Sequence, residues 1–150
     1  MIEVLVTIIV IAIGVLGAAA LQVTTLKNLN SSHSATVAAM VAEDLGERMR
    51  ANPDAVLAND YVHDTAPTGF TDCSANSCDE AQLADYDMGS WWNQLTALLP
   101  AGSGEVTRND GTDTFVVTVR WDEDRSGSDG TNCPPQSASD LECYQFNVTM

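Results

Sequence analysis

The first third of the chain shows two hydrophobic patterns in succession. Val4–Leu21 is apolar apart from Thr7 and carries no charge. Residues 22–51 are mixed, and one apolar stripe recurs every four positions: Val37, Val41, Leu45 and Met49. No proline interrupts either part, so the pattern predicts one continuous helix over about 2–51 that ends at Asn52-Pro53. Its first half is apolar on all sides and suits lipid or other helices, whereas its second half suits the surface of a folded head.

The apolar half has three interpretations, and Glu3 distinguishes them. Ala18-Ala19-Ala20 looks like a signal-peptide cleavage site, but such peptides begin with a positive region and this segment has none. A plain membrane anchor explains the length, because 18 apolar residues span about 27 Å. Neither explains a carboxylate at the edge of the span. A helix that is stored in the bilayer and later packs against its copies does, because Glu3 then pairs with a neighbour's N-terminal amine.

Beyond Pro53 the pattern breaks into shorter elements. We expect an irregular connection over 53–78 and a short helical turn from Asp79 to about Tyr86. A helical apolar stripe then ends at Pro100: Met88, Trp91, Trp92, Leu95, Leu98 and Leu99. At this spacing the two adjacent tryptophans indicate core packing more than a ligand-binding box.

Three further segments predict strands. Glu105–Arg108 leads into the turn Asn109-Asp110-Gly111, and Thr114–Trp121 and Glu142–Thr149 alternate between apolar and polar residues. The apolar positions form two inner faces: Phe115, Val117, Val119 and Trp121, and Tyr144, Phe146 and Val148. The fold class is therefore α+β, with the long N-terminal helix packed against a small antiparallel sheet.

Charge is concentrated in the predicted head. The chain has a formal net charge of -15, and residues 52–150 hold 17 of its 21 acidic residues against only three arginines. Such a surface repels nucleic acid and anionic headgroups, so we expect neither as a partner. A solvated, soluble head is the usual meaning of this excess, with divalent-cation binding or salt tolerance as alternatives.

The four cysteines lie in the same part of the chain. The short spacings suggest disulfides Cys73–Cys78 and Cys133–Cys143, although four cysteines allow three connectivities. Neither spacing is C-x-x-C, and His33 and His63 lie far from both in sequence, which argues against zinc. Disulfides indicate an oxidising location, in the periplasm, at the cell surface or beyond.

An acidic loop is a weak candidate for calcium. Asp122, Asp124 and Ser126, followed by Gly127, resemble the start of a calcium-binding loop. Cys133 occupies the place of the bidentate glutamate, so a solvated loop tethered by Cys133–Cys143 is the favoured interpretation. No catalytic motif is present, and we expect no enzyme activity and no cofactor other than this possible calcium.

Several segments resemble known families. Met1-Ile2-Glu3-Val4-Leu5-Val6 before an apolar helix is similar to the start of mature type IV pilins and pseudopilins. Further segments resemble the type IV pilus modification protein (PilV) family of minor pilins: Gly14-Val15-Leu16-Gly17, Leu21-Gln22, Arg48-Met49-Arg50-Ala51-Asn52-Pro53, Leu98-Leu99-Pro100 before Gly102-Ser103-Gly104, and Val117-Thr118-Val119-Arg120-Trp121.

The resemblance implies a pilin-like fold and a subunit that helps to initiate or cap type IV pili. Glu3 matches the family's glutamate at the fifth mature position, so we expect Met1 to be an internal methionine, two residues into the mature protein. Residues 1–27 would form the transmembrane and filament-core half of the helix, 28–52 its amphipathic half and 53–150 a periplasmic head.

The resemblance also implies partners and a location. The expected partners are other minor pilins, the major pilin and the inner-membrane pilus assembly platform. The subunit would begin in the inner membrane and end in the pilus at the cell surface. Two alternatives stay open: an I-type minor pseudopilin of type II secretion, and a signal-anchored periplasmic interaction module that holds calcium or a partner.

Overall fold

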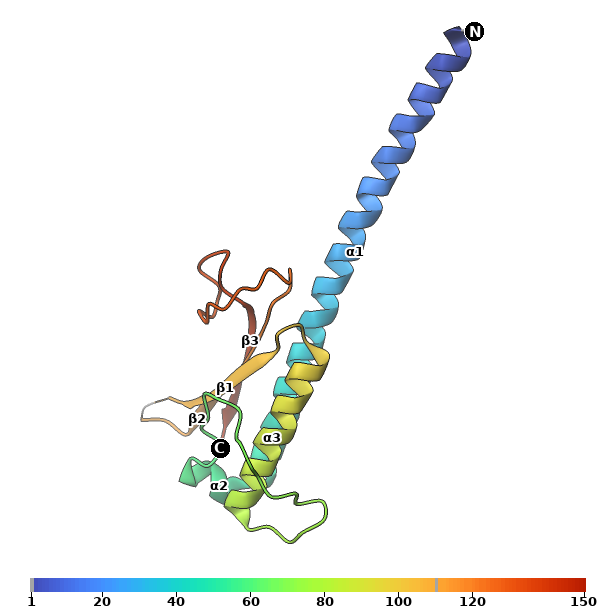
Figure 1. Cartoon of the computed structure of the whole chain (residues 1–150). Helices are drawn as coiled ribbons and strands as arrows, with labels where there is room; N and C mark the ends of the chain where they lie inside the picture. Colours follow the sequence, from blue (N-terminus) through green and yellow to red (C-terminus); the bar gives the residue numbers. More distant parts are fainter. Residues whose placement is uncertain (1, 110) are drawn as a thin grey trace. The chain divides into compact units, whose positions relative to one another are not determined.

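The computed structural model describes residues 2–109 and 111–150, which form two compact units. The first unit ends at His33 and is a single stretch of helix; the second, residues 34–150, contains all the other elements. Helix α1 (Ile2–Ala51) runs without a break through both, so the predicted helix over 2–51 is confirmed (Figure 1). It ends where Asn52 precedes Pro53, because a residue before proline avoids helical dihedrals.

The second half of α1 is the backbone of the head's core. Its buried residues follow the predicted stripe: Ala38, Val41, Ala42, Leu45, Gly46 and Met49. Met40, beside the stripe in sequence, is 64% exposed. Gly46 lets the sheet approach the helix closely, because a Cβ there would lie 2.6 Å from the Phe146 ring.

Two helices follow α1, and the sequence predicted them imperfectly. The connection expected over 53–78 begins with helix α2 (Pro53–Ala58), where proline at the first position has the φ a helix needs and lacks only an N–H that would be unpaired. The expected short turn and later stripe form one helix, α3 (Glu80–Leu98). Asp79 caps it, since the Asp79 carboxylate accepts from Gln82 N–H and the Gln82 side chain accepts from Asp79 N–H.

The sheet contains three antiparallel strands in the order β1 (Ser103–Arg108), β2 (Thr114–Trp121) and β3 (Glu142–Thr149). The predicted bounds of β2 and β3 are confirmed, and β1 begins two residues earlier than the expected Glu105. Gly104 permits this, because a Cβ there would collide with the Trp91 ring and stand 2.8 Å from Thr118 O. Asp110, in the predicted turn, lies outside the described residues.

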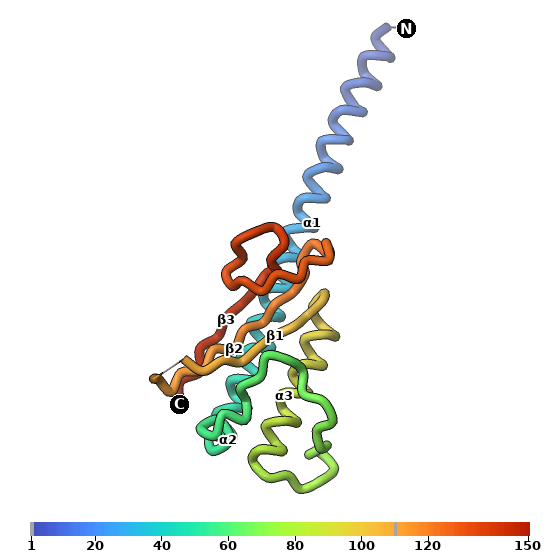
Figure 2. The backbone as a smooth tube through the Cα atoms, turned by 60° about the vertical axis from the view of Figure 1, so that its left-hand side comes forward, coloured from blue at the N-terminus to red at the C-terminus, as the bar shows by residue number. Residues whose placement is uncertain are grey.

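One apolar cluster joins the second half of α1 to α3 and the sheet. The backbones of these elements lie side by side in Figure 2. Trp91 is fully buried, and its Nε1–H donates to Val41 O at 3.1 Å, so α3 is tied to α1 in the middle of the core. Trp92 packs at the edge of this cluster, which agrees with a core role for both tryptophans. Leu98, expected in the same stripe, is 58% exposed.

Candidate assembly site

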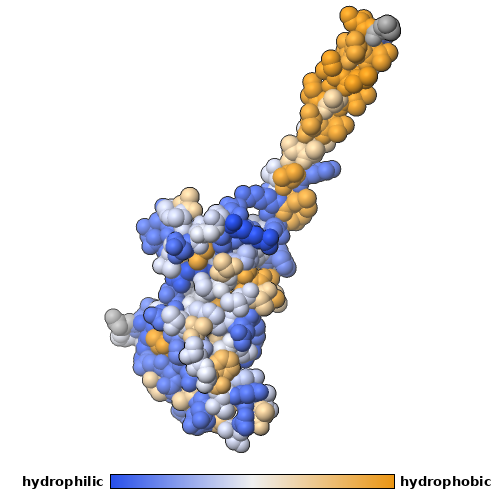
Figure 3. All heavy atoms as spheres, in the orientation of Figure 1, coloured by the Kyte–Doolittle hydropathy of each residue, from blue (hydrophilic) through white to orange (hydrophobic). Residues whose placement is uncertain are grey.

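The exposed half of α1 is the most unusual surface of the molecule. Every described side chain from Ile2 to His33 is exposed, including large apolar ones such as Ile2 at 79% and Leu21 at 72%. Figure 3 shows the N-terminal part of this stretch as nearly continuous hydrophobic colour. The Thr7 hydroxyl donates to Val4 O at 2.8 Å, so the one polar side chain in Val4–Leu21 is satisfied within the helix. An apolar surface this large requires lipid or other protein to cover it.

Glu3 lies in the first turn of α1 and is exposed. A carboxylate there is favoured by the unpaired N–H groups and the positive end of the helix dipole. The next lysine or arginine is Lys27, 24 residues on, which is about 36 Å along a helix. No cationic side chain on this segment can therefore reach Glu3. The N-terminal amine that we expect as its partner belongs to another subunit, and Met1 of this chain lies outside the described residues.

Length and composition also allow α1 to cross a membrane. Among the described residues it is the one helix that meets both requirements, and none of its most apolar 18-residue stretch is buried. Core helices of soluble proteins meet the same requirements, but they are mostly buried. The first half of α1 is therefore built to be covered by something outside this chain.

A buried polar cluster, not foreseen from the sequence, closes the other end of α1. Arg48 Nη1 donates to Asp87 Oδ1 at 3.1 Å, and Tyr61 OH donates to Asp87 Oδ2 at 2.8 Å. Asn52 Nδ2 donates to the Tyr61 hydroxyl at 3.4 Å and to Glu80 O at 2.8 Å. The cluster fixes the corner where α1, α2 and α3 meet.

Electrostatics keep the Arg48 and Tyr61 donors of this corner protonated. Burial lowers the pKa of Arg48, but hydrogen bonds to Asp87 and Asp44 outweigh it and leave that pKa above its ordinary value. Burial raises the pKa of Tyr61, and its hydrogen bond to Asp87 adds to the rise against the opposing effect of Asn52. Both groups therefore stay protonated near neutral pH, which suits a structural role for their hydrogen bonds.

The head contains both disulfides suggested by the cysteine spacing. Cys73 and Cys78 are bonded with their Cα atoms 5.6 Å apart, and Cys133 and Cys143 with theirs 5.9 Å apart. The first closes the loop before α3, and the second ties the loop between β2 and β3 to the start of β3. Both therefore restrain loops of the head.

The calcium candidates lie in the loop between β2 and β3, where the Asp122 carboxylate binds backbone N–H groups of the loop itself. This carboxylate accepts from Ser126 N–H at 3.1 Å and from Gly127 N–H at 2.8 Å. Burial raises the pKa of Asp122, but these hydrogen bonds outweigh it and hold the pKa below its usual range. Asp124 does not complete a ligand set with it: no group of three His, Cys, Asp or Glu side chains in the described chain is placed to hold a metal. Calcium binding remains a prediction.

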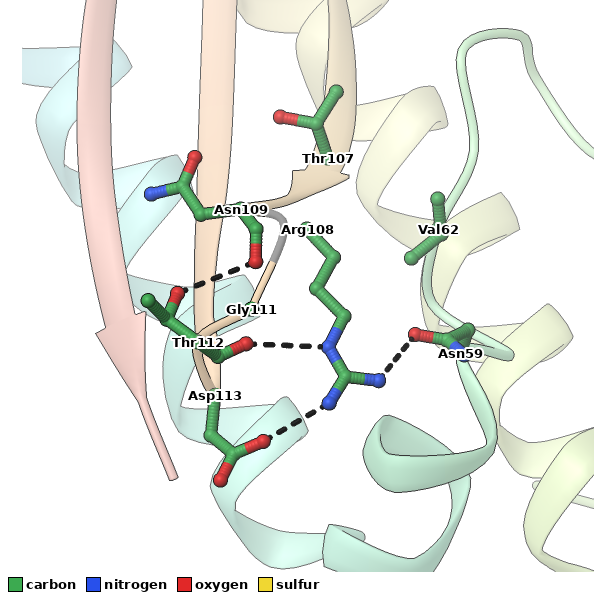
Figure 4. Close-up of a pocket in the computed structure, with 8 residues that line it drawn as sticks. All are labelled: Asn59, Val62, Thr107, Arg108, Asn109, Gly111, Thr112 and Asp113. Atoms are coloured by element: carbon green, nitrogen blue, oxygen red, sulfur yellow. Dashed lines mark hydrogen bonds and ion pairs between the residues drawn. The ribbon is translucent and has the colours of Figure 1, made fainter.

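A polar hollow opens beside the turn between β1 and β2 (Figure 4). The Arg108 guanidinium lines it and donates to Asn59 Oδ1 at 3.0 Å, to Asp113 Oδ1 at 2.9 Å and to Thr112 O at 3.4 Å. It also stacks over the Phe115 ring. Arg108 thus makes its hydrogen bonds within the chain and holds the turn between β1 and β2 against the end of α2.

The fold and one comparison agree on the class of protein. A long N-terminal helix packed on a three-stranded antiparallel sheet, with two disulfides in the head, is consistent with the pilin fold. The model of a family described as Tt1218-like, type IV pilin Tt1218, matches residues 20–89 and supports a type IV pilin family. That family is structural and not enzymatic, which supports the role of a pilin subunit. No curated protein and no solved structure matches the chain.

Proposed function

We propose that this chain is a minor pilin of the PilV type, which helps to initiate or cap type IV pili. It begins in the inner membrane with its head in the periplasm and then joins the pilus at the cell surface. Its partners are other minor pilins, the major pilin and the inner-membrane assembly platform. The observation that carries the proposal is Glu3 in the first turn of a helix whose first half is apolar and wholly exposed.

Assembly exchanges one apolar environment for another. In the bilayer, lipid tails cover residues 4–21, and in a filament the helices of other subunits cover them. Since both surroundings are apolar, this exchange provides little net driving force, and specific polar contacts then decide position. A Glu3 carboxylate beside a neighbouring N-terminal amine provides such a contact and fixes the axial register of the two helices.

The segments that resemble the PilV family have structural tasks in the head. Arg48 and Asn52 supply two members of the buried corner, and Pro53 starts α2. Gly102, just before β1, and Gly104, within β1, permit a close approach to α3, because a Cβ would collide with the Leu95 backbone at the first position and with the Trp91 ring at the second. These tasks support the interpretation that the resemblance extends over the head as well as the N-terminus.

The test replaces Glu3 in the full chain. Glu3→Ala should insert in the membrane as the wild type does, but it should lose co-purification with other pilins and reduce surface piliation, because the inter-subunit ion pair is missing. Glu43→Ala is the matched control, since Glu43 is an exposed acid on the same helix but within the head. If Glu3→Ala assembles and supports piliation as well as the wild type and Glu43→Ala, the proposal fails.

The identity of the co-purified proteins separates this function from its alternatives. Pilus subunits support the minor pilin, and secretion-system subunits support an I-type minor pseudopilin. A signal-anchored interaction module would bind its ligand without any pilin present. Calorimetry with calcium on the detergent-solubilised chain tests the calcium form of that alternative, and an absence of both heat and thermal shift would remove it.

A further inference from the structure

The outer edge of β3 is an unpaired strand edge. β3 is the last strand in the sheet order, and its eight residues pair in continuous register with β2 alone. Within the described chain, no backbone group of residues 142–149 bonds to any other segment. Every second residue of an edge strand directs its N–H and C=O groups away from the sheet, so this border offers a row of free donors and acceptors.

The opposite edge of the sheet, formed by β1, is partly covered by another segment of the chain. On β1, Val106 N–H donates to His63 O at 2.8 Å, so the connection after α2 covers part of that edge. His63 is itself held there, with Nε2 3.1 Å from Asp60 O. The head thus protects one edge and leaves the other open.

From Tyr144 to Thr149 the β3 edge lacks the usual devices against pairing, whereas the chain at the start of β3 is tied to the preceding loop by Cys133–Cys143 and by the pairing of Gly130 with residues 139–141. Cys143–Thr149 contains no charge and no proline, and its register with β2 has no bulge. Tyr144, Phe146 and Val148 pack toward the core, while Gln145 and Asn147 are exposed. A strand added here would meet uncharged polar side chains, which accept many partners.

Charge indicates the kind of partner. At the start of β3, Glu142 lines a hollow with Asp122, Glu123, Asp124 and Asp140, and Arg125 is the one cation in that loop. At the other end, Asp113 is already paired with Arg108. Residues 143–149 are therefore uncharged, the Glu142 end is acidic, and the Arg50 guanidinium of α1, paired with Glu47, lies over the Phe146 ring. A second copy of the chain fits poorly, because both heads are strongly acidic and repel each other.

We propose that the outer edge of β3 binds an extended segment of another protein, which adds as a fourth strand and places a lysine or arginine beside Glu142. Backbone hydrogen bonds supply the affinity, and the charge selects the partner. This surface lies on the head, and the proposal does not depend on the role of Glu3.

The experiment measures backbone hydrogen exchange by mass spectrometry on the full chain in detergent. The probe is the peptide Lys-Lys-Thr-Val-Thr-Val-Thr-Lys-Lys. The peptide should slow exchange in residues 142–149. It should lose this effect when alternate backbone nitrogens of the peptide are methylated, since methylation blocks the hydrogen bonds between strands but keeps the charge.

The second test concerns charge. A peptide with glutamate in place of each lysine should bind more weakly. Glu142→Lys should weaken binding of the lysine peptide several-fold, whereas Asp54→Lys, an equal charge change on α2, should not.

Three outcomes would overturn the inference. The first is unchanged exchange in 142–149 at saturating peptide. The second is equal protection by the methylated peptide, which would reduce the effect to charge attraction. The third is protection of 142–149 that appears on concentrating the chain alone, which would make the occupant a second copy.

Discussion

Asp87 is the residue on which most of the head's corner depends. It lies on α3, is 7% exposed, and joins Arg48 of α1 to Tyr61 of the connection after α2. Removing one partner of a buried ion pair leaves the other charge without compensation, which costs more than the intact pair contributes. The three elements therefore share one electrostatic constraint.

We expect Asp87→Ala to lower the free energy of unfolding by about 2–3 kcal/mol. The figure is below that of a fully buried pair because the Arg48 side chain keeps 29% of its surface exposed. Chemical denaturation of the full chain in detergent, followed by tryptophan fluorescence, measures the change. Asp64→Ala, at an exposed acid, is the control; equal stability of the two variants would contradict the role of Asp87.

Substitution of Gly104 tests how closely β1 packs on α3, with no change in charge. Gly104→Ala should destabilise the head by about 1–3 kcal/mol, because the new methyl group must displace the Trp91 ring or the strand backbone. Gly17→Ala is the matched control, since nothing lies within 4 Å of a Cβ there, and it should leave the unfolding of the head unchanged. The same denaturation experiment measures both. A Gly104→Ala variant as stable as Gly17→Ala would show that the core adapts without cost.

Two carboxylates stabilise the connection between β2 and β3 by hydrogen bonds to its backbone N–H groups. Asp122 binds backbone N–H groups near its start, and Asp140 accepts from Gln136 N–H and Ser137 N–H, both at 2.8 Å, near its end. The hydrogen bond from Gln136 is the main reason why the pKa of Asp140 lies below its usual range. Arg120, which is paired with Glu105, donates to Thr131 O and fastens the middle of the loop to the sheet.

The loop's stability should therefore depend on pH. The folded-state pKa of Asp122 lies below the unfolded value of about 3.9, so its contribution is present above that value and is lost as pH falls through the folded pKa. We expect Asp122→Asn to be less stable than the wild type at about pH 7 and the difference to shrink below about pH 4. Denaturation across this range measures it. Asp129→Asn, at an exposed acid in the same loop, should show no such convergence; a constant deficit of Asp122→Asn would contradict the assignment.

Elements were predictable where local signals were strong. The stripe of Val41, Leu45 and Met49 and the alternation in β2 and β3 gave the correct structure because the apolar residues of each face the core. Helix α2 was missed, because six residues that begin with a proline carry too little periodicity. The division of α3 into two parts was wrong, because a single capped helix accommodates Gly89, against which the Phe70 ring packs.

At the scale of the whole molecule, the core and the exposed apolar surface occupy different parts of the chain. The first buried side chain is Ala38, and residues 2–33 contribute nothing to the core. The second unit, residues 34–150, holds all the strands and both disulfides. Its stability should not require the first half of α1.

A chain that begins at residue 28 should therefore fold and remain soluble without detergent. We expect the near-ultraviolet circular dichroism of its tryptophans to match that of the full chain, because their surroundings lie within residues 34–150. The same variant should fail to enter membranes or pili. A truncated chain without near-ultraviolet signal, or one that aggregates at low concentration, would show that the removed segment stabilises the head.

The sequence by itself determined the long helix, the two classes of surface along it, the acidic head, the strands and the position of Glu3. These follow from local periodicity and from which residues are charged. Only the tertiary structure revealed Asp87 as the partner of Arg48, 39 residues away, the close approaches at Gly46 and Gly104, and the open edge of β3. Such contacts join segments that are distant in sequence, and their geometry exists only after the chain has packed.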